Sequence, residues 1–169
     1  MPNFVYLSFG SNLGDREANL SHALVAVENI EGFDLVSCSS IYISEAVGME
    51  KPTPEFLNLV IKGEYQYRPQ ELLNALELIE KKMGRTGKGK YLPRSIDIDV
   101  LLFGEEVVES DRLSIPHRKL TERPFILVPL LQIEPDLTYP VTRESLSTYL
   151  RDKDRKKVLM YKEALTRNV

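Results

Sequence analysis

The hydrophobic positions of this chain fall into short runs that predict β-strands. Residues 4–9, 35–43 and 56–65 are rich in β-branched and aromatic side chains, which favour extended backbone, and turn-forming residues flank them. The first run stops at residues 10–14, which read Gly-Ser-Asn-Leu-Gly. A loop at residues 48–54 separates the second run from the third, and we expect these two strands to pair as a hairpin with a long loop.

Other segments repeat their hydrophobic residues with the period of a helix. Asp15 is a suitable N-cap for a helix that ends near residue 30, and Pro69 suits the first turn of a second helix. Further helices are predicted at residues 125–132 and 144–150. Because hairpins, rather than strict β-α-β crossovers, join the elements, the predicted fold class is α+β. We expect a ferredoxin-like antiparallel sheet covered by helices in α/β/α layers.

Residues 96–103 form a predicted strand that carries two acids. Alternation places Asp97 and Asp99 on one face, ~7 Å apart along the strand. The residues expected on the opposite face are Ile96, Ile98, Val100 and Leu102. Because a buried carboxylate is costly unless it is paired or bound to metal, we predict a Mg²⁺ site that takes a phosphate-bearing substrate. The alternative is that this half of the strand protrudes into solvent, with Arg94 as a surface counter-charge.

Glu80 lies inside the apolar stripe of the second predicted helix. On a helical wheel it falls between Leu76 and Leu73. Two interpretations are open. The side chain could reach solvent along the edge of the stripe, or its carboxylate could face the same pocket as the two aspartates and organise basic groups there.

Residues 84–93 contain three glycines and three cationic side chains, those of Arg85, Lys88 and Lys90. Their Gly-x₄-Gly-Lys spacing resembles the start of a P-loop. A tyrosine, however, stands where the Mg²⁺-binding Ser or Thr is required, and the order is helix-loop-strand, so we reject that interpretation. We predict a mobile basic loop that closes over a polyphosphate. A solvated basic connector is the alternative.

His117 lies in a basic stretch at residues 112–123. Two histidines far apart and one cysteine give no zinc-ligand spacing, so His117 is predicted to contact phosphate together with the neighbouring arginines. A solvated charged loop is the other interpretation, because individual surface charges contribute little.

Length and composition narrow the possible classes of function. At 169 residues the chain suits one domain, and we expect a single domain over residues 1–169, although two very small domains would have compatible lengths. The net charge of -3 and the pI of about 5.5 argue against a general binder of nucleic acid or anionic membranes. The N-terminus lacks the features of a signal peptide, and the longest apolar run, residues 125–131, is too short to cross a bilayer. We therefore expect a soluble, cytoplasmic protein.

Five short sequence segments, taken together and in order, identify a family. They are Gly10-Ser11-Asn12-Leu13-Gly14, Phe56-Leu57-Asn58, Gly84-Arg85, Pro93-Arg94-Ser95-Ile96-Asp97-Ile98-Asp99, and Pro116-His117 followed by Arg123-Pro124-Phe125. Through these segments the chain resembles the 6-hydroxymethyl-7,8-dihydropterin pyrophosphokinases of folate biosynthesis over nearly its whole length. The combination is specific, whereas Gly-Ser-Asn-Leu or D-x-D alone would be weak.

The resemblance implies that a pyrophosphoryl group passes from ATP to the hydroxymethyl group of the pterin, with release of AMP. It implies two Mg²⁺ ions held by Asp97 and Asp99, and a stacked pterin ring between Phe56 and Phe125. The catalytic residues it implies are Arg85, Arg94, Asp97 and Asp99. For pterin binding it implies Ser44, Glu45, Val47, Phe56, Asn58, Asp97 and Phe125. For ATP binding it implies Glu80, Arg85, Arg94, Val100, Arg112, Ser114, His117 and Arg123.

Two other functions compete with this one. An RNA-recognition module could share the ferredoxin-like topology, but the chain lacks an aromatic-rich RNP segment, and its central strand carries acids where RNA requires cations. A nucleotidyltransferase that releases pyrophosphate is the enzymatic rival. We expect ATP and the pterin as the ligands, no nucleic acid or membrane as partners, and a monomer.

Overall fold

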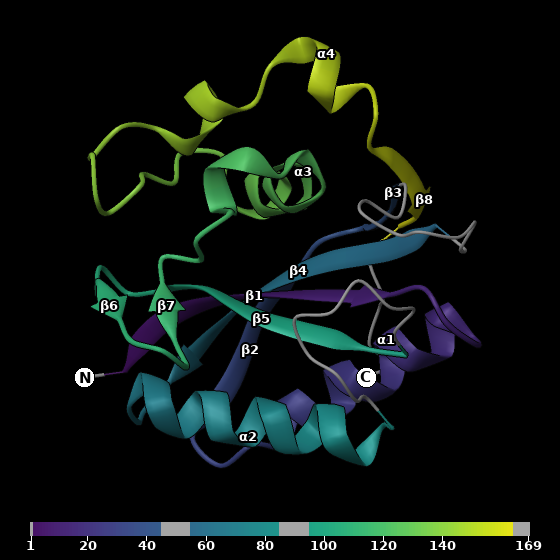
Figure 1. Ribbon diagram of the computed structural model, residues 1–169, viewed down its shortest axis with the longest axis vertical. Helices are drawn as coiled ribbons and strands as arrows, with labels where there is room; N and C mark the ends of the chain where they lie inside the picture. Colours follow the sequence, from purple (N-terminus) through teal and green to yellow (C-terminus); the bar gives the residue numbers. More distant parts are fainter. Residues whose placement is uncertain (1, 45–54, 85–94, 164–169) are drawn as a thin grey trace.

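The computed structural model describes residues 2–44, 55–84 and 95–163 (Figure 1). Within these residues one antiparallel sheet contains the strands β1 (Asn3–Ser11), β2 (Phe33–Cys38), β3 (Ile41–Ser44), β4 (Phe56–Tyr65), β5 (Asp97–Phe103) and β8 (Leu159–Lys162). The strand order is β5-β1-β4-β3-β8, and β2 also pairs with β4. A small second sheet pairs β6 (Val108–Glu109) with β7 (Ser114–Ile115).

Helices cover both faces of the sheet (Figure 1). On one face lie α1 (Arg16–Glu28) and α2 (Pro69–Lys82), and on the other lies α3 (Pro124–Ile133). This arrangement confirms the predicted α+β fold with α/β/α layers. Shorter helical turns are η1 (Leu120–Glu122), η2 (Leu146–Tyr149) and α4 (Asp152–Arg155). Among the described residues, none of the helices has both the length and the hydropathy that crossing a bilayer requires.

The helix starts follow the predicted local signals. Asp15 is the N-cap of α1, where its carboxylate accepts a hydrogen bond from the backbone N–H of Ala18 at 3.1 Å. Pro69 occupies the first turn of α2, where a missing N–H costs nothing. The predicted helix at residues 144–150 is wrong in type and length, because only Leu146–Tyr149 are helical and they form a 3-10 turn.

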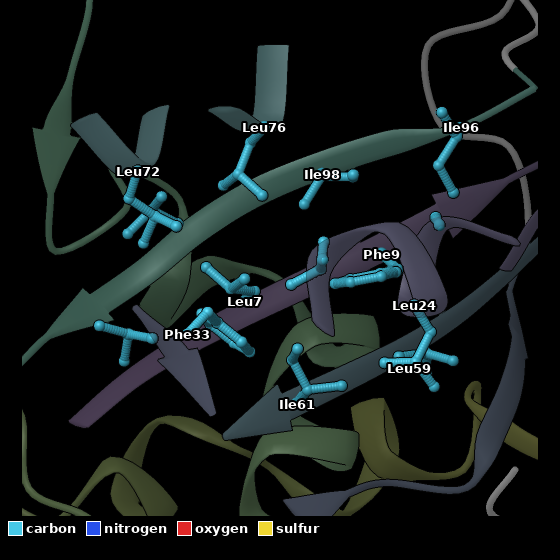
Figure 2. Close-up of a cluster of buried hydrophobic side chains, with 14 of the residues drawn as sticks. Leu7, Phe9, Leu24, Phe33, Leu59, Ile61, Leu72, Leu76, Ile96 and Ile98 are labelled. Carbon is cyan, nitrogen blue, oxygen red and sulfur yellow. The ribbon is translucent and has the colours of Figure 1, made fainter. Parts of the chain in front are cut away.

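Two hydrophobic cores lie on the two faces of the sheet. Figure 2 shows the first core, where Leu7, Leu59 and Ile98 from the strands pack with Leu24 of α1 and Leu72 of α2. The second core lies under α3. Its buried residues include Tyr6, Val60, Leu101, Leu102, Ile126, Leu127 and Leu130. Each fully buried aliphatic side chain stabilises the fold by roughly 1.5–3 kcal/mol, so burial holds both helical layers on the sheet.

The single strand predicted at residues 35–43 is interrupted. Ser39 still exchanges backbone and side-chain hydrogen bonds with Val60, since its N–H donates to the Val60 carbonyl at 2.8 Å and its hydroxyl accepts from the Val60 N–H at 2.9 Å. The N–H of Ser40 donates instead to the side chain of Gln132 on α3, at 2.8 Å. Both halves pair antiparallel with β4, which confirms the expected hairpin pairing.

A β-bulge separates the acidic half of β5 from its apolar half. Two successive residues of β1 lie opposite Val100 and Leu102, so Leu101 between them is an extra residue. Ile96, Ile98 and Val100 pack in the core of α1 and α2, as predicted, but Leu102 packs under α3. The predicted face of Leu102 is wrong because the bulge shifts the alternation by one residue.

An ion pair holds the last turn of α3 on the sheet. Glu134, the C-cap of α3, accepts hydrogen bonds from the ammonium of Lys62 at 2.6 Å and from the hydroxyl of Tyr6 at 3.0 Å. The Lys62 hydrogen bond, supported by the one from Tyr6, lowers the pKa of Glu134 below its ordinary value of 4.5. Burial is the main cause that raises the pKa of the Tyr6 phenol, so Tyr6 stays neutral and donates.

This ion pair predicts a specific loss of stability in acid. Because the folded-state pKa of Glu134 lies below its unfolded value, the carboxylate stabilises the fold above pH 4.5, and this contribution disappears as the pH falls through the folded pKa. The Glu134→Gln variant should therefore be less stable than wild type at pH 7, by about 1 kcal/mol or less because the pair is partly solvated. The difference should shrink at pH 3.

Urea unfolding at both pH values measures this effect. The exposed Glu106→Gln variant serves as the control, and it should unfold like wild type at each pH. A stability difference for Glu134→Gln that is the same at pH 7 and pH 3 would show that the carboxylate charge is not what matters.

Candidate functional site

Asn58, Gly10 and Asp97 form one row across three neighbouring strands. Gly10 of β1 lies opposite Asn58 of β4 on one side and opposite Asp97 of β5 on the other. Paired residues project from the same face of a sheet, and Val60, two residues beyond Asn58, packs under α3. The row therefore lies on the α3 face, and its ends are two strand spacings apart, ~10 Å.

Gly10 leaves space in the middle of this row. A Cβ atom there would lie 3.0 Å from the side-chain oxygen of Asn58 and 3.5 Å from the ring of Phe56. Any other residue would fill the space beside Phe56 and would require the Asn58 side chain to shift slightly. Glycine thus forms a floor on which a flat molecule can approach the backbone closely.

Ser44 fixes the orientation of Asn58. The side-chain amide of Asn58 donates to the hydroxyl of Ser44 at 2.8 Å, and both residues are buried. Ser44 in turn lies opposite Phe56 in the β3-β4 pair. The structure therefore brings together three of the predicted pterin-binding residues, Ser44, Phe56 and Asn58, on the same face of the sheet as Asp97. The predicted residues Glu45 and Val47 lie outside the described residues.

The two aspartates point to the same face, as predicted. Asp99 lies opposite Ser8 in the β1-β5 pair, and both acids are partly buried rather than protruding into solvent. The solvent-exposed alternative is therefore wrong. Within the described residues, no three His, Cys, Asp or Glu side chains gather as a complete metal cage. Two carboxylates fit Mg²⁺ nonetheless, because this ion takes its remaining ligands from water and substrate phosphates.

His117 lies beside Asp99. Its Nε2 is 3.7 Å from a carboxylate oxygen of Asp99, while its Nδ1 accepts a hydrogen bond from the N–H of Lys119 at 3.1 Å. With Nδ1 as an acceptor, the proton of the neutral ring is on Nε2, facing Asp99. The backbone N–H of His117 also donates to the carbonyl of Leu101 at 2.9 Å. His117 is thus held against the acidic strand rather than in a solvated loop.

Glu80 holds the outer edge of the same strand. It is only 3% exposed, and its Oε2 accepts a hydrogen bond from the backbone N–H of Ile98 at 3.0 Å. Ile98 stands between Asp97 and Asp99, so this bond fixes the backbone that carries both acids. The interpretation in which Glu80 reaches solvent is wrong.

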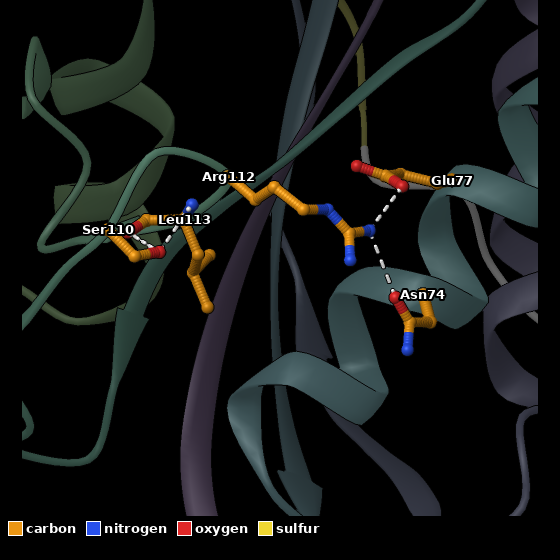
Figure 3. A network of polar contacts seen from close by, with 5 residues as sticks. All are labelled: Asn74, Glu77, Ser110, Arg112 and Leu113. Carbon is orange, nitrogen blue, oxygen red and sulfur yellow. Dashed lines mark hydrogen bonds and ion pairs between the residues drawn. The ribbon is translucent and has the colours of Figure 1, made fainter.

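The remaining predicted nucleotide residues are spread over a wider surface. Figure 3 shows Arg112 reaching toward α2, where its guanidinium donates to Asn74 at 3.0 Å and to Glu77 at 2.8 Å. The hydroxyl of Ser114 lies 3.4 Å from a carboxylate oxygen of Glu109. Arg112 is therefore already engaged by a carboxylate and an amide of α2.

The other two predicted residues of this group are placed differently. The guanidinium of Arg123 lies 5.7 Å from the ring centre of Phe125, in the first turn of α3. Val100 is buried in the core of α1 and α2, so its side chain cannot touch a nucleotide and only its backbone could. Arg85 and Arg94 lie outside the described residues.

Two features of this site do not follow from the sequence. Gly10 reads as part of a turn, although strand pairing makes it the floor of the row. Tyr42 lies opposite Asn58, and its hydroxyl donates to Gln132 at 2.9 Å. The alternation of residues 56–60 indicates which face of the sheet carries Asn58. No local signal shows that Gln132 of α3 contacts that face.

Comparisons with known proteins identify the family of this chain. The sequence model of the 7,8-dihydro-6-hydroxymethylpterin-pyrophosphokinase (HPPK) family matches residues 6–135. A 2-amino-4-hydroxy-6-hydroxymethyldihydropteridine pyrophosphokinase of Aquifex aeolicus is 42% identical over 146 residues, which cover 86% of this chain and 89% of the relative. The enzyme of the same name from Bacillus subtilis is 38% identical over 133 residues, which cover 79% of each chain.

Larger proteins contain a similar region. The folic acid synthesis protein fol1 of Schizosaccharomyces pombe is 43% identical over 145 residues, which are 86% of this chain but 20% of that protein. Among solved structures, wild-type HPPK-DHPS of Plasmodium falciparum superimposes with a TM-score of 0.66 at 15% identity, covering 88% of this chain and 44% of that one. The chain thus spans most of the bacterial relatives and less than half of these longer proteins.

Proposed function

Because this chain belongs to the 7,8-dihydro-6-hydroxymethylpterin-pyrophosphokinase family, we propose that it transfers the pyrophosphoryl group of ATP to the hydroxymethyl group of 6-hydroxymethyl-7,8-dihydropterin. The family consists of enzymes, so membership favours a transferase over an RNA-recognition module. The acceptor oxygen bonds to the β-phosphorus, and the bond from that phosphorus to the α–β bridging oxygen breaks. AMP leaves, and the acceptor hydroxyl loses its proton.

The row of Asn58, Gly10 and Asp97 is the observation that carries this proposal. Asn58, held by Ser44, offers hydrogen-bonding groups to the polar edge of a flat heterocycle at one end. Gly10 provides the flat floor, and Asp97 stands at the other end. A bicyclic ring with a one-carbon substituent fits the ~10 Å span, which would bring its hydroxyl to the acidic strand.

The acidic strand supplies the phosphate half of the site. Asp97 and Asp99 would hold two Mg²⁺ ions, which would neutralise charge on the transferring phosphates. Glu80 keeps the strand between them in place through Ile98, and His117 presents its Nε2 beside Asp99. We propose that Arg85 and Arg94 act on the transferring phosphates and that Arg112, Ser114 and Arg123 contribute on the nucleotide side.

Family membership also underlies our proposals for domain organisation, oligomeric state, location and ligands. Residues 1–169 would work as one domain and as a monomer in the cytoplasm, with ATP and the pterin as ligands. The chain has a net charge of -3, which disfavours binding of polyanionic nucleic acid. ATP that binds together with Mg²⁺ carries a smaller negative charge and is compatible with it.

The nucleotide product distinguishes this reaction from its rivals. Enzyme incubated with Mg²⁺, ATP and the pterin should convert ATP to AMP in equal amount to pterin diphosphate, as measured by ion-exchange chromatography. ADP would indicate an ordinary kinase, and pyrophosphate would indicate a nucleotidyltransferase. Either of these products in place of AMP would overturn the proposal.

The acceptor site also predicts a selective loss of pterin binding. Phe56→Ala or Phe125→Ala should weaken pterin binding by at least ~1 kcal/mol, because each change removes stacking and buried aromatic area. ATP binding should change little. Calorimetric titration with each ligand measures both affinities.

Tyr67→Ala is the control for this experiment. Tyr67 is an exposed aromatic residue just beyond the far end of β4 from Phe56, so its loss should leave both affinities unchanged. If the Phe56 or Phe125 variant lost affinity for both ligands equally, general damage to the sheet would explain the result better than a stacked pterin.

A further inference from the structure

The last turn of α3 is tied to the neighbouring strand by one side-chain amide, that of Gln132. Its Oε1 accepts from the backbone N–H of Ser40 at 2.8 Å and from the hydroxyl of Tyr42 at 2.9 Å. Its Nε2 donates to the hydroxyl of Ser40 at 2.9 Å. Ser40 and Tyr42 are both buried, so these bonds reach from the helix surface into the sheet.

Two features make this contact more than a surface hydrogen bond. Ser40 lies at the break between β2 and β3, and Gln132 satisfies the N–H that donates outside the sheet there. Tyr42 lies opposite Asn58, the residue at one end of the row of Asn58, Gly10 and Asp97. Gln132 therefore fixes α3 against the strand that borders the proposed pterin site.

The other end of α3 carries Phe125. A helix rises 1.5 Å per residue, so Phe125 lies ~10 Å from Gln132 along the axis of α3. Glu134 forms a second attachment, to Lys62 on β4 and Tyr6 on β1. The two attachments fix the last turn of α3 at two points of the sheet, while the buried Ile126, Leu127 and Leu130 hold the rest of the helix by packing. Loss of the Gln132 attachment would leave Glu134 as the remaining polar contact of that turn, and a small shift of the helix would displace Phe125.

We propose that Gln132 is a positioning residue that sets the distance between Phe125 and the row of Asn58, Gly10 and Asp97. The inference rests on the proposed function, because Phe125 matters in this way only if it covers the pterin ring. Gln132 touches neither substrate; it acts through the placement of α3.

Pterin affinity of three variants tests this inference, measured by calorimetry in the presence of Mg²⁺ and a non-hydrolysable ATP analogue. Gln132→Ala should weaken pterin binding about five- to tenfold, a loss that corresponds to one or two hydrogen bonds, and should leave the affinity for the analogue unchanged. Gln132→Glu should restore pterin binding, because its carboxylate can accept from the Ser40 N–H, the Ser40 hydroxyl and the Tyr42 hydroxyl. Tyr42→Phe, which removes one of the three bonds, should give a smaller loss than Gln132→Ala.

Val27→Ala separates positioning from stability. Val27 is fully buried in the core on the opposite face of the sheet, so its truncation should lower the melting temperature and leave pterin affinity at the wild-type value. Equal pterin affinity in Gln132→Ala and wild type would overturn the inference, as would a loss that Gln132→Glu does not restore or that Val27→Ala reproduces. Wild-type protein that bound no pterin would instead overturn the proposed function, and the inference with it.

Discussion

Asp97→Asn and Asp99→Asn are each expected to lower kcat by about 10²–10³-fold, because each removes a carboxylate that would hold Mg²⁺ against the transferring phosphates. The substitution keeps the size of the side chain and the pairing of β5 with β1. It removes the negative charge that a hard cation requires. The fold should therefore persist while the chemical step slows.

Steady-state rates measured across a range of Mg²⁺ concentrations test this expectation, with circular dichroism to confirm folding. Asp34→Asn is the matched control, because Asp34 is also a strand aspartate but is exposed and lies on β2. It should retain wild-type kcat. Near-normal turnover of both Asp97 and Asp99 variants at saturating Mg²⁺ would rule out the metal-site assignment.

Arg85→Ala and Arg94→Ala are expected to slow the chemical step by a similar factor, about 10²–10³-fold. Cations that meet charge developing on a transferring phosphoryl group stabilise the transition state more than the ground state. Pterin affinity should change far less than the rate, because the acceptor row of Asn58, Gly10 and Asp97 is left intact. Shortening the basic loop by deleting residues 87–90 should have the same selective effect.

Rapid-quench measurement of a single turnover separates chemistry from product release in these variants. The rate of AMP formation in the first turnover should fall with kcat. Arg143→Ala, which removes an exposed arginine paired with Glu105, should behave like wild type. If AMP formed at the wild-type rate in the first turnover while steady-state turnover fell, the arginines would govern product release instead of catalysis.

Several parts of the fold and site could be predicted from the sequence, because neighbouring residues carry the physical signal. The cap at Asp15 and the proline at the start of α2 act within one helical turn. Alternation along β5 was enough to place Asp97 and Asp99 on one face. The motifs identified the family because they are short segments whose order along the chain is itself informative.

Other features depended on pairing between distant segments. The bulge at Leu101 reverses the predicted face of Leu102, and only the register of β5 against β1 reveals it. The break at Ser39 and Ser40 looks like continuous strand in the sequence. It forms because the Ser39 hydroxyl and the amide of Gln132, 92 residues from Ser40, replace ladder hydrogen bonds.

The environment of Glu80 also depended partly on local sequence and partly on tertiary structure. The helical wheel placed this acid within the apolar stripe but left two environments open. The solvent-exposed environment is excluded because a donor meets the buried carboxylate, and that donor is the N–H of Ile98, 18 residues away on β5. The sequence by itself determined which residue types were available and how each segment would fold locally. Tertiary structure decided their partners, because a buried polar group is stable only where the fold brings it a hydrogen bond.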